Sequence, residues 1–294
     1  MIISASYKTD IPAFYADWFL ERLRAGCVRV VNPYGGPVQT VSLARDAVSG
    51  FVFWTRNARP FRTALAAVAG RGDAFVVQYT ITGYPRTLDA GTIATGRAID
   101  DLRHLAATYG SKTVVWRYDP IVATSLTPFP WHEATFDGLC RELEGAVDEV
   151  VVSFAHIYRK TARNMAAAAR VHGFDWWDPP VEEKQDLLVR LKSIAHRHGI
   201  ALTLCGQPEC AVAGVAEARC IDAERLAAVA GHPLEAVRKP HRPRCGCWAS
   251  KDIGAYDTCP HGCVYCYAVS NRTRAKERHR RHDPTAPGCG SPRR

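Results

Sequence analysis

Short apolar runs alternate with helical patterns along the first 205 residues. Six runs of four to eight residues are rich in β-branched and aromatic side chains, which is typical of buried strands. They cover residues 2–5, 51–55, 74–81, 113–118, 149–154 and 200–205. The segments between them have the apolar spacing of helices, and these cover residues 12–25, 60–69, 92–109, 131–147, 160–172 and 181–198. This alternation predicts parallel strands joined by helical crossovers, and therefore an α/β fold.

One early segment departs from this alternation. The stretch "CVRVVNPYGGPVQTVSL" has two short β-like runs separated by Gly35 and Gly36. Glycine favours a hairpin turn because it adopts positive φ without steric cost. We therefore expect a hairpin inserted between the first two strands of the sheet.

Polar side chains gather where the predicted strands end. Parallel sheets place their chemistry at the carboxyl ends of their strands. Arg117 and Asp119, in the segment "WRYDP", are the candidate catalytic residues. Further candidates to line the site and contact a cofactor are Asp10, Thr55, Asn57 and Gln78. Each residue type is also common at helix N-caps and in turns, so the coincidence across several strands is the stronger indication.

Composition limits the class of protein. With 294 residues and 47% hydrophobic side chains, the chain has enough apolar surface for one large core, which we assign to residues 1–205. There is no apolar run of 18 residues and no signal-peptide pattern, so we expect a cytoplasmic protein with no membrane partner. In that compartment cysteines serve as metal ligands more often than as disulfides, and most of the 11 cysteines lie beyond residue 200.

The stretch "CPHGCVYCYA" places Cys259, Cys263 and Cys266 in a CxxxCxxC pattern. Structural zinc sites commonly use CxxC pairs, but Cys259 has no such partner. Three neighbouring thiolates suit a 4Fe-4S cluster with one iron left open to a ligand from outside the protein. The pattern, with the aromatic Tyr265 before its last cysteine, resembles the signature of radical S-adenosylmethionine enzymes.

That resemblance implies a cofactor and a chemistry. In the superfamily, the amino and carboxylate groups of S-adenosylmethionine bind the open iron, and the aromatic residue at the position of Tyr265 lies near the adenine. Reductive cleavage, with an electron from a reductant such as flavodoxin or ferredoxin, gives a 5'-deoxyadenosyl radical. The sequence does not indicate the substrate of that radical.

The late position of the motif predicts an unusual strand order. Enzymes of this type carry the motif after the first strand of a partial TIM-type (β/α) barrel. Here residues 251–257 have the pattern of that strand, 267–280 that of the following helix, and 2–5 that of the next strand. We therefore expect a circularly permuted partial barrel, which the cysteine-rich segment 206–280 completes. Residues 281–294 are expected to form a disordered basic tail.

The resemblance to a known family extends over nearly the whole chain. The segments that carry it are "TDIPAFY", "FVFWTRN", "WRYDPI", "DIGAYDTC" and "HGCVYCYA". Together they resemble the bacterial family known as domain of unknown function 1848. That family has no established reaction, so the resemblance implies the cluster and the fold but no substrate.

Four further cysteines form a second candidate site. Cys205 ends the last predicted strand, Cys220 begins "CIDAERL", and Cys245 and Cys247 form the "CGC" just before the motif strand. Thiolates that converge from three segments would hold an auxiliary 4Fe-4S cluster. A zinc site at the same four positions and buried thiols without a ligand are the alternatives.

Positive charge is concentrated at the end of the sequence. Residues 238–294 carry 13 Lys and Arg against 4 Asp and Glu, whereas the preceding part is balanced. A basic run can bind nucleic acid, but it is equally the polar face of a helix after the motif. Two other functions therefore stay open: a zinc-stabilised nucleic-acid-binding protein, and an iron-sulfur protein for electron transfer or sensing without a radical.

Overall fold

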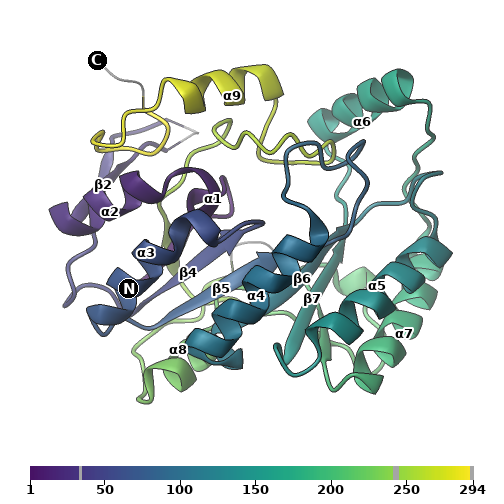
Figure 1. Cartoon of the computed structure of the whole chain (residues 1–294), viewed down its shortest axis with the longest axis horizontal. Helices are drawn as coiled ribbons and strands as arrows, with labels where there is room; N and C mark the ends of the chain where they lie inside the picture. Colours follow the sequence, from purple (N-terminus) through teal and green to yellow (C-terminus); the bar gives the residue numbers. More distant parts are fainter. Residues whose placement is uncertain (33–34, 241–244, 292–294) are drawn as a thin grey trace.

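The computed structural model describes residues 1–32, 35–240 and 245–291, and its centre is one parallel sheet of eight strands (Figure 1). In order across the sheet, the strands are β10 (Ser250–Asp252), β1 (Ile2–Ala5), β4 (Gly50–Thr55), β5 (Phe75–Thr80), β6 (Val114–Ile121), β7 (Glu149–Phe154), β8 (Ala201–Leu204) and β9 (Ala216–Glu217). Each neighbouring pair is parallel. The predicted α/β class is confirmed.

Helices connect most of these strands. They are α1 (Ile11–Phe14), α2 (Ala16–Ala25), α3 (Arg62–Gly70), α4 (Thr95–Tyr109), α5 (Phe129–Leu143), α6 (Arg159–His172), α7 (Val181–Arg197), α8 (Ala223–Ala230) and α9 (Arg272–Arg280). All six predicted strands and the helices between them are present, and β2 (Cys27–Val30) pairs with β3 (Gln39–Ser42) in the predicted hairpin. Helix α8 and strand β9 were not predicted. Within the described ranges, no helix is both long and apolar enough to cross a membrane.

Helix α7 shows how local sequence sets these elements. Pro180 precedes it, and Glu182 and Glu183 occupy its first turn, where their charge complements the helix dipole. Its apolar side chains recur every three to four residues, and four of them are buried against the sheet: Leu187, Leu188, Leu191 and Ile194. Each such side chain contributes roughly 1.5–3 kcal/mol when it leaves water.

The two faces of the sheet pack against different parts of the chain. Successive side chains of a strand point to opposite faces of the sheet. Phe51 and Phe53 therefore pack under the crossover helices, while Val52 points to the opposite face, which we call the inner face. The inner face is covered by a loop-rich segment that includes α8, through residues 218–236 and 245–248. This segment brings cysteines from the end of the chain against the inner face.

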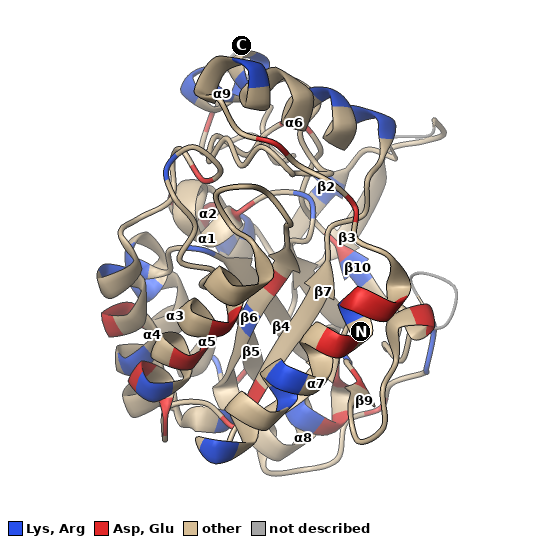
Figure 2. Cartoon of the chain, turned by 90° about the vertical axis from the view of Figure 1, so that its right-hand side faces the viewer, with Lys and Arg blue, Asp and Glu red and all other residues tan. Residues whose placement is uncertain are grey.

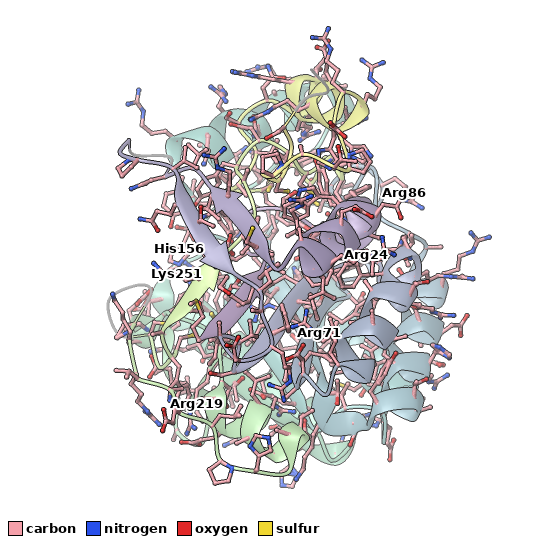
Figure 3. The ribbon with its side chains drawn as sticks, turned by 90° about the vertical axis from the view of Figure 1, so that its left-hand side faces the viewer. Arg24, Arg71, Arg86, His156, Arg219 and Lys251 are labelled. Carbon is pink, nitrogen blue, oxygen red and sulfur yellow. The ribbon has the colours of Figure 1, made fainter. Side chains whose placement is uncertain are left out.

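The last strand of the chain lies beside the first. Strand β10 pairs with β1 in parallel, with Ser250 opposite Ile2 and Asp252 opposite Ser4, and Lys251 marks this edge of the sheet in Figure 3. The strand that precedes the cysteine motif therefore lies beside the first strand of the chain, which is the neighbour expected for it. In the described part of the chain no pairing joins β9 to β10, so the sheet is open and a closed barrel is not found.

The end of the described chain is folded. We expected disorder from residue 281 onward, but residues 281–291 turn back along α2 and β2, so this expectation was wrong for them. Trp18 Nε1 donates to Ala286 O at 2.9 Å, and Arg29 N donates to Pro287 O at 2.8 Å. Cys289 is buried there. The rest of the expected tail, residues 292–294, lies outside the described residues.

Candidate metal centres

The cysteine motif lies in a loop, residues 253–271, that follows β10 and that we call the motif loop. At Gly254 a Cβ would lie 2.2 Å from Ser6 Oγ, so only glycine lets the loop approach the end of β1 so closely. Tyr15 of the N-cap region of α2 donates from its hydroxyl to Thr258 O at 2.7 Å. The loop is therefore held by elements from the start of the chain.

Asp252, the last residue of β10, ties the motif loop to β1. Its carboxylate accepts hydrogen bonds from Ser4 Oγ and Ser6 Oγ, both at 2.9 Å, and from two backbone amides. Lys8 Nζ lies 3.5 Å from the same carboxylate. With the side chain only 4% exposed, the buried charge is satisfied by these partners. Sequence reasoning missed Asp252, although its place just before "IGAYDTC" was an available signal.

Cys259, Cys263 and Cys266 are half-buried and influence one another through space, without sulfur contact. Burial and the nearby Asp10 carboxylate raise the pKa of Cys259 to about 12, and burial also raises the pKa of Cys263 and Cys266. The amide of Ala268 donates to Cys266 Sγ at 3.3 Å. As free thiols they are protonated at neutral pH, so a metal that binds them displaces their protons.

Cationic side chains surround the motif thiols. Arg56 lies near Cys263 and Cys266, and Lys160 of α6 lies near Cys266. Arg272, the first residue of α9, lies near the same two cysteines. Lys and Arg residues of α6 and α9 gather at this end of the molecule (Figure 2). Positive charge stabilises thiolates, so these surroundings suit an anionic ligand set.

Tyr265, the aromatic residue of the motif, is locked in a buried polar network. Its hydroxyl donates to Asp89 Oδ1 and accepts from Arg56 Nη2, both at 2.6 Å. Arg56 Nη1 lies 2.5 Å from Asp89 Oδ2, and the Tyr84 ring packs edge-on against the Tyr265 ring. Neither Arg56 nor Asp89 was a predicted site residue, since Asp89 lies in a loop well after the end of β5. The network fixes the Tyr265 ring beside the motif thiols.

Three of the predicted lining residues support the backbone. Asp10 is the N-cap of α1, and its carboxylate also lies 2.8 Å from His261 Nε2 of the motif loop. Thr55 Oγ1 accepts from the amide of Asn57 at 2.9 Å, and the Asn57 side chain accepts from the amide of Arg59. Asp10 therefore adjoins the motif loop, whereas Thr55 and Asn57 shape the turn after β4.

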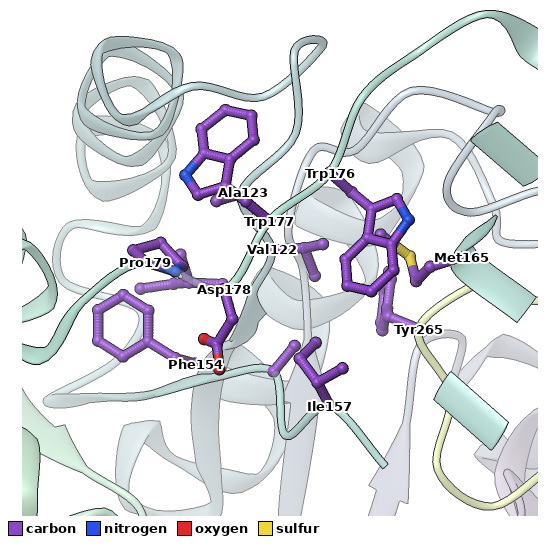
Figure 4. A pocket seen from close by; sticks show the side chains of 12 residues that line it. Val122, Ala123, Phe154, Ile157, Met165, Trp176, Trp177, Asp178, Pro179 and Tyr265 are labelled. Atoms are coloured by element: carbon purple, nitrogen blue, oxygen red, sulfur yellow. The ribbon is translucent and has the colours of Figure 1, made fainter. Parts of the chain in front are cut away.

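A small apolar hollow of about 10 Å³, room for about one water molecule, lies beside Tyr265. Val122 and Phe154 line it at the ends of β6 and β7, and Met165 of α6 and Trp176 complete its walls (Figure 4). The Trp176 indole lies next to Met165 and Tyr265 in this view. The hollow thus offers flat, apolar walls next to the motif.

The four-cysteine set, by which we mean Cys205, Cys220, Cys245 and Cys247, comes together on the inner face of the sheet. Cys205 Sγ lies 3.3 Å from Cys220 Sγ. Cys220 in turn contacts Cys247, and Cys247 contacts Cys245. The amide of Ile221 donates to Cys247 Sγ at 3.4 Å. The four thiols therefore form one continuous series, although they come from three separate segments.

Arg117, Asp119 and Gln78 face the four-cysteine set. Arg117 Nη1 donates to Cys220 Sγ and to Gln78 Oε1, both at 3.1 Å, and Nη2 donates to Asp119 Oδ2 at 2.6 Å. The guanidinium also lies 5.0 Å from the centre of the Trp54 ring. These predicted residues lie on the inner face because alternate residues of a strand share one face. Asp119 also accepts a hydrogen bond from Ser153 Oγ of β7.

The two sets differ in how closely their sulfurs approach. Over the described ranges, no three His, Cys, Asp or Glu side chains are grouped so that they already hold a metal ion. A tetrahedral zinc site places four sulfurs about 2.3 Å from one centre, and therefore about 3.8 Å from one another. The contacts within the four-cysteine set are of that order, with 3.3 Å between Cys205 Sγ and Cys220 Sγ, whereas the motif thiols influence one another without sulfur contact.

Comparison with known proteins gives one match. A family model described as Domain of unknown function (DUF1848) matches residues 2–268, which include both cysteine sets and all the candidate residues. No curated protein and no solved structure matches the chain.

Proposed function

The chain belongs to the family described as domain of unknown function 1848, and we propose that it is an iron-sulfur enzyme that generates a radical from S-adenosylmethionine. The proposal depends on the arrangement of Cys259, Cys263 and Cys266. These thiols lie in a loop at the carboxyl edge of a parallel sheet, near cationic side chains and without sulfur contact. Three protein thiolates suit a 4Fe-4S cluster that keeps one iron for another ligand.

The side chains around the motif fit such a cluster. When bound, it would supply the one-electron reductive cleavage of S-adenosylmethionine to methionine and a 5'-deoxyadenosyl radical, with a flavodoxin or ferredoxin as the electron donor. Arg56, Lys160 and Arg272 offset the negative charge of the thiolates. The Ala268 amide donates to the Cys266 sulfur, as second-shell donors do in metal sites.

We propose that the adenosine part of the cofactor packs beside Tyr265, at the rim of this hollow. Aromatic and apolar side chains suit contact with a purine ring, and Trp176 and Met165 lie there. The hydrogen bonds to Asp89 and Arg56 hold the Tyr265 ring in place. Because the hollow has room for only about one water molecule, its walls would have to move apart to admit the purine.

The strand order supports the finer architecture that we propose, a partial TIM-type barrel in permuted order. The strand before the motif adjoins β1, and the motif loop lies over the carboxyl ends of the following strands. In barrels of this kind the loops at this edge carry the chemistry. In the permuted order, the motif loop still follows a strand at the carboxyl edge of the sheet, as in an unpermuted barrel.

The basic helix α9 also supports this function over a nucleic-acid-binding one. Arg272 lies near the motif thiols, and Arg278 Nη1 donates to Tyr256 O of the motif loop. Two of its cations thus serve the motif loop, and Arg274, Lys276 and Arg280 are exposed. A protein that uses structural zinc and this helix to bind nucleic acid would be colourless and would bind with strong salt dependence.

Cleavage of S-adenosylmethionine tests the proposal. We expect anaerobically reconstituted protein with sodium dithionite to release 5'-deoxyadenosine, measured by chromatography. Cys263→Ala should reduce the release to the uncatalysed background, because two thiolates do not hold the cluster. Cys27→Ala, in the hairpin strand β2 and outside both sets, is the matched control and should keep wild-type activity. Iron-loaded wild-type protein that releases no 5'-deoxyadenosine would contradict the proposal.

A further inference from the structure

The four-cysteine set draws on segments from both sides of the open sheet. Cys205 directly follows β8, near one edge, and Cys247 lies just before β10, the strand at the other edge. Cys220 comes from the loop between β9 and α8, and Cys245 precedes Cys247 by two residues. Cys220 and Cys247 are almost fully buried, at 5% and 3% exposure. The set therefore brings together segments that no described pairing of strands joins.

The spacing of these thiols suits the ligands of one ion. Sulfurs bound to one tetrahedral zinc lie about 3.8 Å from one another, because each is about 2.3 Å from the metal. Cys205 Sγ lies 3.3 Å from Cys220 Sγ, and side-chain contacts join Cys220 to Cys247 and Cys247 to Cys245. Over the described part of the chain, no three such side chains already hold an ion. The outer thiols of the series must therefore turn toward its centre when a metal binds.

Hydrogen-bond donors point at two of these sulfurs. Arg117 is only 4% exposed, and its Nη1 lies 3.1 Å from Cys220 Sγ. Its Nε and Nη2 both donate to Asp119, which fixes the direction of the guanidinium. The amide of Ile221 donates to Cys247 Sγ at 3.4 Å. Donors of this kind stabilise the negative charge of metal-bound thiolates, so the surroundings suit thiolates better than neutral thiols.

We propose that Cys205, Cys220, Cys245 and Cys247 bind one zinc ion, which joins the chain after β8 to the chain before β10. Four sulfur ligands in a tetrahedron select zinc or iron, and zinc(II) binds a given set of ligands more tightly than iron(II) does. The thiols bind as thiolates, and their protons leave to solvent. Because four protein ligands fill the coordination of the ion, its role is structural. The inference goes beyond the proposed radical function and does not depend on it, because the ligands are different residues.

Metal analysis of a variant without the motif cysteines tests this proposal. In the Cys259→Ala/Cys263→Ala/Cys266→Ala protein, any metal that remains is held elsewhere. After incubation with zinc sulfate and dialysis against metal-free buffer, we expect about one zinc per chain in this variant. Adding Cys220→Ala and Cys247→Ala should reduce zinc to near zero. Cys210→Ala, which removes a buried thiol outside both sets, is the matched control and should leave the zinc content unchanged.

Urea denaturation gives a second readout. An ion that binds only the folded chain raises its stability, so zinc should raise the urea midpoint of the triple variant. The midpoint should not respond to zinc once Cys220 and Cys247 are also replaced. If the triple variant does not fold, the wild type should hold about one zinc more per chain than Cys220→Ala/Cys247→Ala protein.

The outcomes separate this inference from the radical proposal. Zinc retained in the triple variant supports the four-cysteine site even if the wild type fails to cleave S-adenosylmethionine. A folded triple variant that binds no zinc, or that takes up iron in preference to zinc when both metals and sulfide are supplied, would overturn the zinc site and leave the radical proposal intact.

Discussion

The two cysteine sets differ in how the chain assembles them. The motif thiols share one short loop, and they lie apart from one another near a hollow. The four-cysteine set joins three distant segments, and its sulfurs are in contact beneath the inner face of the sheet. Catalytic metal sites keep a coordination position open, whereas closed sites use protein ligands throughout. We therefore propose that the motif set carries the chemistry and that the other set has an accessory role.

The charged side chains around the two cysteine sets also differ, in the number of cations and in how each cation is held. Arg56, Lys160 and Arg272 come from three separate elements around the motif thiols. Beside the four-cysteine set, Arg117 is held in one direction by Gln78 and Asp119. Several cations around an open site suit an anionic ligand that enters and leaves. A single fixed donor suits a permanent centre.

Among changes that affect only one of the two cysteine sets, we expect the largest effect from Asp252→Ala. This change removes the acceptor for four hydrogen bonds and the partner of Lys8 at the base of the motif loop. We expect the free energy of unfolding, measured by urea denaturation, to fall by about 3 kcal/mol. Iron bound after anaerobic reconstitution should fall from about four per chain to near zero, because the motif loop loses its anchor.

The control for this variant is Asp186→Ala, a change to an exposed carboxylate on α7. It should change the unfolding free energy by less than about 0.5 kcal/mol and leave the iron content unchanged. Undiminished iron in Asp252→Ala would contradict the role of Asp252 as the anchor of the motif loop.

A smaller effect, limited to the four-cysteine set, is expected from Arg117→Lys. Lysine keeps the charge but cannot bind Cys220, Gln78 and Asp119 together. We expect the free energy of unfolding, measured by urea denaturation, to fall by about 1.5 kcal/mol, because buried polar partners lose hydrogen bonds. Arg141→Lys, on the exposed surface of α5, is the matched control. An unchanged unfolding free energy in Arg117→Lys would mean that the guanidinium does not hold these partners together.

The strands and helices could be predicted because the residues of each one carry its full pattern of apolar and polar positions. The six predicted strands are buried apolar runs, and the placement of β10 beside β1 followed from the position of the motif. The structure also brings together Cys205, Cys220, Cys245 and Cys247, while a shared metal at these positions stays a prediction. By contrast, α8 and the folded segment 281–291 lacked such a signal, since their order depends on contacts with distant elements.

The neighbours of each candidate residue were less predictable. We expected Arg117 and Asp119 at the end of their strand, but β6 continues to Ile121 and both lie within it, as Gln78 lies within β5. The direction of these side chains brings them to Cys220 or to one another. Thr55 and Asn57 use their polar atoms in the turn after β4. Asp89 binds the Tyr265 hydroxyl from the loop after β5, and the sequence does not predict the path of that loop. A strand pattern predicts which residues share a face of the sheet. It does not predict which neighbouring groups their side chains contact.

The most direct test of the central claim is low-temperature EPR of reduced protein before and after addition of S-adenosylmethionine. The sample is the Cys205→Ala/Cys220→Ala/Cys247→Ala variant, in which only the motif cysteines remain to bind a cluster. We predict a cluster signal whose g values shift when the cofactor is added, because the open iron gains a ligand. A cluster signal that the cofactor leaves unchanged would contradict the assignment of the motif set as the radical centre.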